Sequence, residues 1–242
     1  MTVEPKLPKT WIESNELGKA LLESANEERT IRGYHFNGGD AEGINAEKVD
    51  FRGCVFENCR LNECVLSNAY FEDTVFYGCE FSNSHLPEAF FRRVKFEKCK
   101  AVGTDFTETV FDEVQLLSCP CKFANFSGTQ WKHSSFSACD LSEDSFQECS
   151  FRSMAFQECN LTRVEFFNTP LSGIDFSTSD IEGLILSGTE LRGAIVTASS
   201  QRFGKIFGIG HTIKTGCYIM NGYKEGAKKW IFIHFAAPSF QI

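Results

Sequence analysis

The chain has 242 residues, of which 42% are hydrophobic and 23% are charged, and its formal net charge is −8 at pH 7. It is therefore long enough for a sizeable core, while its acidic balance argues against direct nucleic-acid binding. No apolar run reaches the length of about 18 residues that spans a membrane, and the first ten residues lack the apolar core of a signal peptide. We therefore expect a soluble, cytoplasmic protein with no membrane contact.

The first thirty residues differ in pattern from the rest of the chain. Residues 1–13 are interpreted as a loose lead-in, and the segment from Ser14 to about Thr30 places Leu17, Leu21 and Ala25 on one helical face. Ser14 or Asn15 is suited to be the N-cap. We assign residues 1–30 to a lead-in and an amphipathic helix that caps the open apolar end of a repeat region.

A five-residue period dominates the middle of the chain. From Phe51 to Val196 an apolar residue returns at every fifth position, with only Ala101 and Cys121 smaller than the others, and a smaller residue stands two positions before each. Residues 31–48 keep the same phase more loosely. A period of five fits neither a helix nor a strand, so it predicts a solenoid in which stacked units share one core.

The pattern of a small residue at i−2, Leu or Phe at i, and polar residues or Gly elsewhere resembles the pentapeptide-repeat family. The resemblance implies an all-β solenoid over residues 31–199, a right-handed quadrilateral β-helix in which four five-residue units make one coil. The sequence supports a repeat of four units, since one cysteine series and one aromatic series recur at intervals of four units. The aromatic members that we predict to form the structural core are Phe56, Phe76, Phe96, Phe136, Phe156 and Phe176.

Cysteine is frequent, with 11 in the chain. Most occupy the small i−2 position, where the resemblance implies an inward side chain, and a buried free thiol behaves as a small hydrophobe. We therefore expect neither a metal site nor disulfides, although thiols stacked in successive coils would lie within bridging distance.

The negative charge belongs to the repeat. Between Val49 and Ser199 there are 22 Asp and Glu against 12 Lys and Arg, a net charge of −10. Glu88, Glu108 and Glu148 share one outward column and are the candidate partner-binding residues. A local basic patch in the middle of the repeat consists of Arg92, Arg93, Lys95, Lys98 and Lys100.

The repeat ends after Val196, and we assign residues 200–242 to a C-terminal cap or tail. Residues 201–209 resemble the short terminal helix through which gyrase-interacting members of the family pair end to end. On that resemblance Ile206, Phe207 and Ile209 are candidate contacts of a homodimer.

No catalytic constellation stands out. There is no phosphate-binding loop, nucleophile elbow or zinc-protease motif, and the histidines are isolated. Adjacent carboxylates such as Glu72 and Asp73 lie in polar positions of the repeat, with no pocket to shift a pKa. We predict a protein that is not an enzyme and has no catalytic residues, cofactor or metal.

Two functions fit such a surface. The chain resembles the quinolone-resistance branch of the family, the Qnr and MfpA proteins, which implies an acidic rod that binds DNA gyrase or topoisomerase IV as a mimic of duplex DNA. The alternative is a generic interaction scaffold for another protein partner. The first predicts a continuous negative face, and the second predicts a face of mixed charge.

Overall fold

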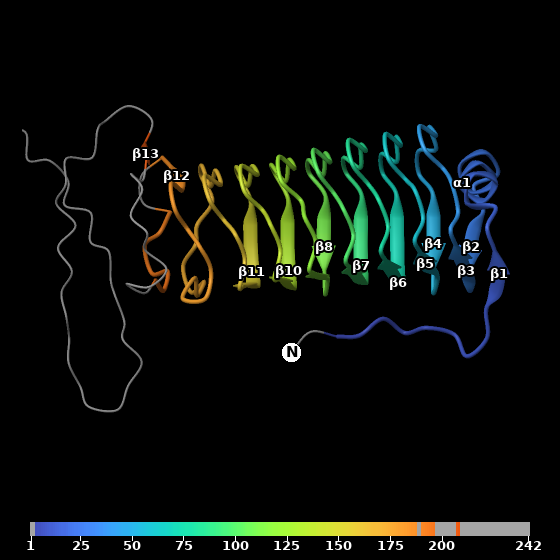
Figure 1. Cartoon of the computed structure of the whole chain (residues 1–242), viewed down its shortest axis with the longest axis horizontal. Coiled ribbons are helices and arrows are strands. Elements are labelled where there is room, and N and C mark those ends of the chain that lie inside the picture. The colour runs from blue at the N-terminus through green and yellow to red at the C-terminus, as the bar shows by residue number, and fades with distance from the viewer. Residues whose placement is uncertain (1–2, 188–189, 197–206, 209–242) are drawn as a thin grey trace, which may run out of the picture.

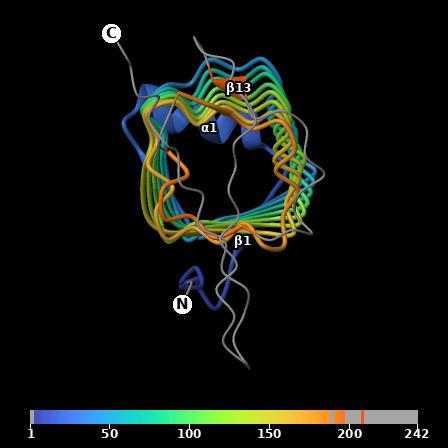
Figure 2. The same cartoon turned by 90° about the vertical axis from the view of Figure 1, so that its left-hand side faces the viewer.

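The computed structural model describes residues 3–187, 190–196 and 207–208, and the repeat forms a rod of stacked, roughly square coils (Figures 1 and 2). The predicted all-β solenoid is confirmed as a parallel β-solenoid with one short N-terminal helix. No helix in the described part of the chain is long and apolar enough to cross a membrane.

Each coil has four sides, and two of them carry the strands. The first side is centred on Phe51, Phe71 and their equivalents, and the second on Phe56, Phe76 and theirs. Successive strands pair in parallel with partners twenty residues apart, as in Phe51↔Phe71 and Phe56↔Phe76. The strands of the rod are β2 (Thr30–Arg32), β3 (Tyr34–Asn37), β4 (Asp50–Arg52), β5 (Val55–Glu57), β6 (Tyr70–Tyr77), β7 (Phe90–Glu97), β8 (Val110–Asp112), β9 (Gln115–Leu117), β10 (Gln130–Ser137) and β11 (Ser150–Gln157).

The other two sides consist of turns joined by single parallel bridges. The third side is centred on Leu61, Phe81 and their equivalents, and the fourth on Leu66, Leu86 and theirs. Bridges such as Glu80↔Lys100 and His85↔Asp105 connect one coil to the next on these sides. The backbone hydrogen bonds of every side therefore run along the rod, which satisfies the main chain of each coil through its neighbours.

Phenylalanine fills the interior in columns. Phe56, Phe76, Phe96, Phe136, Phe156 and Phe176 are at most 4% exposed, which confirms them as core residues. Phe56 stacks on Phe76 with ring centroids 4.6 Å apart, and Phe76 stacks on Phe96 at 4.8 Å. The small Ala101 leaves a cavity of about 10 Å³ lined by residues that include Phe81, Phe96 and Phe106.

A left-handed backbone residue follows two positions after each central residue. From residue 33 to residue 173 every residue at this position has a positive φ, between 49° and 81°. None of them is Val, Ile or Thr, whose branched side chains tolerate this region least. Thr178, the first β-branched residue at this position, is not left-handed. The repeat therefore turns its corners with one left-handed residue per five.

The cysteines lie inside the rod as predicted. All ten cysteines of the described residues are free and buried. Eight of these ten thiols donate to carbonyls of the preceding coil, as Cys79 Sγ does to Phe56 O at 3.3 Å. Thr104 Oγ1 makes the equivalent bond to Phe81 O at 2.8 Å. Burial raises the pKa of Cys64 to about 11, so this thiol stays protonated.

Helix α1 (Leu17–Asn26) packs over the N-terminal end of the rod (Figure 1), with Leu17 and Leu21 fully buried. The predicted cap was wrong. Glu16 occupies the N-cap without a side-chain hydrogen bond, and Ser14 Oγ instead accepts the Glu16 N–H at 3.1 Å. Ser14 is unavailable as the cap because it belongs to strand β1 (Ile12–Ser14).

The lead-in is ordered along the rod, which corrects our prediction of a loose segment. Strand β1 pairs in parallel with β3, and the residues before it run back beside the second side (Figure 1). The Lys6 N–H donates to Asp73 Oδ1 at 2.8 Å, and Gln115 Nε2 donates to Glu4 Oε1 at 3.4 Å. Pro8 lies over Gly53, where an added Cβ would be 3.5 Å from Pro8 Cδ.

The coils continue in register to Ile195, which bridges to Asp175. Strand β12 (Ile185–Leu186), on the fourth side of the rod, also pairs in parallel with β13 (Phe207–Gly208). The interval from Ile185 to Phe207 exceeds the usual twenty by two residues. Of the predicted dimer contacts, Ile206 and Ile209 lie outside the described residues, and only the backbone of Phe207 is placed.

Candidate interaction surfaces

One side of the rod carries acidic residues without basic ones. The outward positions of the fourth side between Val65 and Ser187 contain no Lys or Arg. We call this surface the acidic face and define it by its five carboxylates: Glu88, Asp105, Glu108, Glu148 and Glu165. His85, which is exposed, is the single imidazole on it, with Nδ1 3.8 Å from Asp105 Oδ2.

The three carboxylates predicted from the sequence lie along one corner of this face. Glu88, Glu108 and Glu148 are all exposed, and each has a φ of 57°. Glu108 folds over the bare Gly128, whose ideal Cβ position is 3.2 Å from Glu108 Cγ. No ion pair involves these three carboxylates within the described part of the chain. Their charges are therefore available to a partner.

Asp105 and Glu165 were not singled out in the sequence. Both are half-buried residues that directly precede a central residue of the fourth side. Gln147 Nε2 donates to Glu165 Oε2 at 2.8 Å, and Thr107 Oγ1 donates to Asp105 Oδ1 at 2.5 Å. Sorting the outward residues into their columns of twenty would have placed them on the same side.

The basic patch does not interrupt the acidic face, because its five residues lie on the other sides. Arg93 is 8% exposed and binds Asp73 through Nε at 2.6 Å and Glu72 through Nη2 at 2.7 Å. Burial alone would raise the pKa of Asp73, but the bonds from Arg93 and from the Lys6 N–H outweigh it and lower that pKa. Lys95 pairs with Glu97 at 2.9 Å. Most of this positive charge is therefore neutralised locally.

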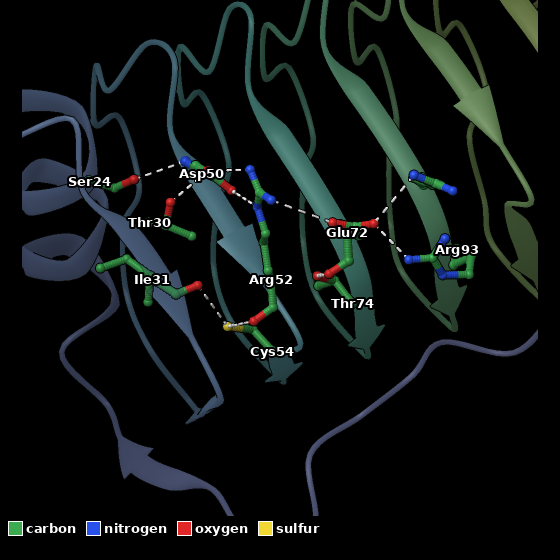
Figure 3. A network of polar contacts seen from close by, with 10 residues as sticks. Ser24, Thr30, Ile31, Asp50, Arg52, Cys54, Glu72, Thr74 and Arg93 are labelled. Carbon is green, nitrogen blue, oxygen red and sulfur yellow. Dashed lines mark hydrogen bonds and ion pairs between the residues drawn. The ribbon is translucent and has the colours of Figure 1, made fainter.

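The first side carries a ladder of alternating charge (Figure 3). Arg52 binds Asp50 through Nε at 2.8 Å and through Nη2 at 2.9 Å, and its Nη1 lies 3.7 Å from Glu72. The Asp50 N–H donates to Ser24 Oγ at 2.9 Å, so the network ties helix α1 to the strands. This side is a mixed surface that stabilises the rod.

The interior offers no evident chemical site. No group of His, Cys, Asp and Glu in the described residues could hold a metal ion. Within the described residues, Asp144 is the one carboxyl at an inward position of the repeat. Its Oδ1 accepts the Ala124 N–H at 2.9 Å, while its Oδ2 has no hydrogen-bond partner. Burial raises the pKa of Asp144 well above its usual value, which favours the neutral form of the carboxyl within the core.

These features define a repeat protein of the parallel β-solenoid class. The chain belongs to the pentapeptide-repeat family. The family model described as "pentapeptide repeat region" matches residues 69–146 and 134–195, and the model "pentapeptide repeats (8 copies)" matches residues 35–68 and 50–86. A comparison with curated proteins gives no match.

Solved structures with the same repeat are similar at low identity. HetL, a protein involved in heterocyst differentiation regulation from the cyanobacterium Nostoc, is 18% identical with a TM-score of 0.39, over 74% of this chain and 90% of that one. Full-length QnrB1, a plasmid-mediated fluoroquinolone resistance protein, is 18% identical with a TM-score of 0.34, over 70% and 85%. Rfr23 from the cyanobacterium Cyanothece is 12% identical with a TM-score of 0.37, over 57% and 95%. At these identities the likeness concerns the fold alone.

Proposed function

We propose that this protein binds DNA gyrase or topoisomerase IV through its acidic face, in the place of duplex DNA, and thereby protects the enzyme from quinolones. The observation that carries the proposal is the run of carboxylates from Glu88 to Glu165 on one side without a single Lys or Arg. A rigid rod with charge on one side can enter a basic DNA-binding groove under electrostatic steering.

The charge density sets the expected strength of this interaction. Five carboxylates over about four coils, at roughly 4.8 Å per coil, give about one charge per 4 Å. Duplex DNA carries one charge per about 1.7 Å. The acidic face therefore has less than half the charge density of the DNA with which it would compete for a basic groove. Because the attraction is electrostatic, salt should weaken the binding strongly.

The mixed ladder of the first side favours a second candidate function. Arg52, Glu72, Arg92 and Asp112 alternate in sign along the rod, as expected of a scaffold whose partner is not a DNA-binding enzyme. Under this alternative the protein is a generic interaction scaffold, and the acidic face is a solvated surface.

A gyrase supercoiling assay with and without a fluoroquinolone, across a salt series, separates the two. The test variant is Glu88→Gln/Glu108→Gln. The matched control is Glu113→Gln/Glu158→Gln, which removes the same charge from the same left-handed backbone position at other corners. We expect the wild type and the control to protect gyrase at low salt and the test variant to lose most of that protection.

Two results contradict the proposal. No effect of the wild type on gyrase or on topoisomerase IV at a large molar excess would leave the scaffold alternative. Equal losses in the test and control variants would show that net charge acts without a defined face.

A further inference from the structure

Phe123 is out of place in the repeat. It is 54% exposed, and the other large hydrophobic residues of comparable exposure in the described chain all lie before residue 23. It also occupies the left-handed corner position, with a φ of 65°. A bulky side chain in this region is an outlier, because its Cβ crowds the backbone.

The fold gives no reason for an aromatic residue here. The same corner carries Gly103 one coil earlier and Gly183 three coils later. An exposed ring contributes little burial to offset an unfavourable backbone conformation. The left-handed conformation is common to every coil, so the exposed apolar ring, and not the conformation, sets this corner apart and calls for a functional explanation.

The surroundings of Phe123 hold the ring at the boundary of the acidic face. Lys122 Nζ lies 4.7 Å from the ring centroid, and the same ammonium pairs with Glu143 Oε1 at 3.3 Å. The Phe123 N–H donates to Ser142 O at 3.3 Å, which fixes the corner to the next coil. Phe123 ends the third side, so the next residues along the chain, from Asn125 onward, belong to the side that carries the acidic face.

Charge alone defines the position of a partner along the rod only weakly. Neighbouring coils are roughly 4.8 Å apart, which is less than the distance of about 8 Å over which charges act at physiological salt. A single aromatic residue removes that ambiguity if it fills one pocket. Aromatic residues surrounded by polar contacts are the usual anchors of protein interfaces.

We propose that Phe123 is the apolar anchor of the acidic face, inserting into an apolar pocket in a basic partner surface and setting the position of the rod on it. The inference rests on the proposed function and names the residue that fixes the docking register. Carboxylates supply attraction and association rate, and Phe123 supplies specificity of position and a slower dissociation.

The test is direct binding of full-length variants to DNA gyrase, with thermal unfolding of each variant. Phe123→Asn replaces the ring with a residue that tolerates the left-handed region. We expect it to bind gyrase about tenfold more weakly than the wild type while its Tm stays equal or rises. His133→Asn is the matched control, since His133 is also an exposed ring at the left-handed position, at another corner.

Salt dependence separates the anchor from the charges. The loss caused by Phe123→Asn should be nearly constant across a salt series, whereas the loss caused by Glu88→Gln/Glu108→Gln should shrink as salt rises. Phe123→Trp should retain most of the binding.

Each failure has its own outcome. Wild-type binding with an unchanged Phe123→Asn variant overturns the anchor alone. Equal losses in Phe123→Asn and His133→Asn also overturn it. Absence of wild-type binding overturns the proposed function and the anchor together.

Discussion

The small inward position of each repeat unit is a hydrogen-bonding position as well as a packing one. Thr104 and Cys79 donate to carbonyls of the preceding coil, and the Cys149 N–H donates to Thr169 Oγ1 at 2.8 Å. Asp144 occupies the same position and accepts the Ala124 N–H in the same way. A neutral carboxyl can therefore replace a hydroxyl at this position, at the cost of a dependence on pH.

The sign of that dependence follows from the raised pKa of Asp144. The unfolded chain releases this proton above about pH 4, whereas the folded protein retains it. Stability relative to Asp144→Thr should therefore fall as the pH rises from about 4 towards the raised pKa, by at most about 1.4 kcal/mol per pH unit. Thermal unfolding between about pH 4 and 8 measures the difference in stability between the wild type and Asp144→Thr. Glu158→Gln, which changes an exposed carboxylate, is the control. If the stability difference between the wild type and Asp144→Thr stays constant with pH, Asp144 is ionised in the folded protein.

The left-handed corner position predicts a contrast between two substitutions of Asn68. Asn68 has a φ of 58° and is exposed. Asn68→Val should lower the free energy of unfolding by about 1 to 2 kcal/mol, because a branched Cβ crowds the backbone there. Asn68→Gly should change it by less than about 0.5 kcal/mol, since Gly adopts this region freely. Urea unfolding compares the two, and equal effects would contradict the steric explanation.

At the scale of the coil, stability depends on how well each interior column is filled. The column of the third side passes from Phe81 to the small residues Ala101 and Cys121, and the cavity lies beside Ala101. A void of this kind lacks the contacts that a filled column supplies. The coil around Ala101 is therefore the place where added volume should help.

Ala101→Val should raise the free energy of unfolding by about 0.5 to 2 kcal/mol, because the added methyl groups occupy the cavity. Phe136→Ala is the opposite change and should lower it by about 3 to 5 kcal/mol. Chemical denaturation measures both. A loss of stability in Ala101→Val would mean that the column is already closely packed.

The sequence predicts the coils better than the segments around them. Phe56 and Phe136 were placed correctly because each coil repeats the same packing problem, and helix α1 was found from its apolar face. The path of the lead-in was missed because Lys6 and Glu4 bind residues far along the chain, and no local pattern records such contacts.

The candidate site was predicted in part for the same reason. Periodicity placed Glu88, Glu108 and Glu148 in one column, but it could not show that Arg93 is neutralised by Asp73. Nor did periodicity reveal that Phe123 has a left-handed backbone conformation, since the φ angles are known only from the structure.

At the scale of the whole molecule, the number of residues in an insertion decides which side of each later coil stacks on which side of the coil before it. Each strand side must stack on a strand side, as β10 does on β11 (Gln130↔Ser150 to Ser137↔Gln157). Duplicating residues 109–128 adds one full coil and keeps every side in place. Duplicating only residues 124–128 preserves the central period but turns all later coils by a quarter.

We therefore expect the twenty-residue duplication to leave the Tm equal or higher, because it adds one more neighbour interface. The five-residue duplication should lower the Tm, since the second half of β10, around Phe136, then stacks on the turn side of Cys121. Circular dichroism and thermal unfolding test both variants. Equal Tm values would show that strand and turn sides are interchangeable.

The returning N-terminal segment has a practical consequence. It lies along the second side, where Glu4 reaches Gln115, and in a four-sided coil the second side is opposite the fourth. A biotin or other linker attached ahead of Val3 would therefore attach the rod to a biosensor surface through its second side. The acidic face would then point away from the support, ready for a partner in solution.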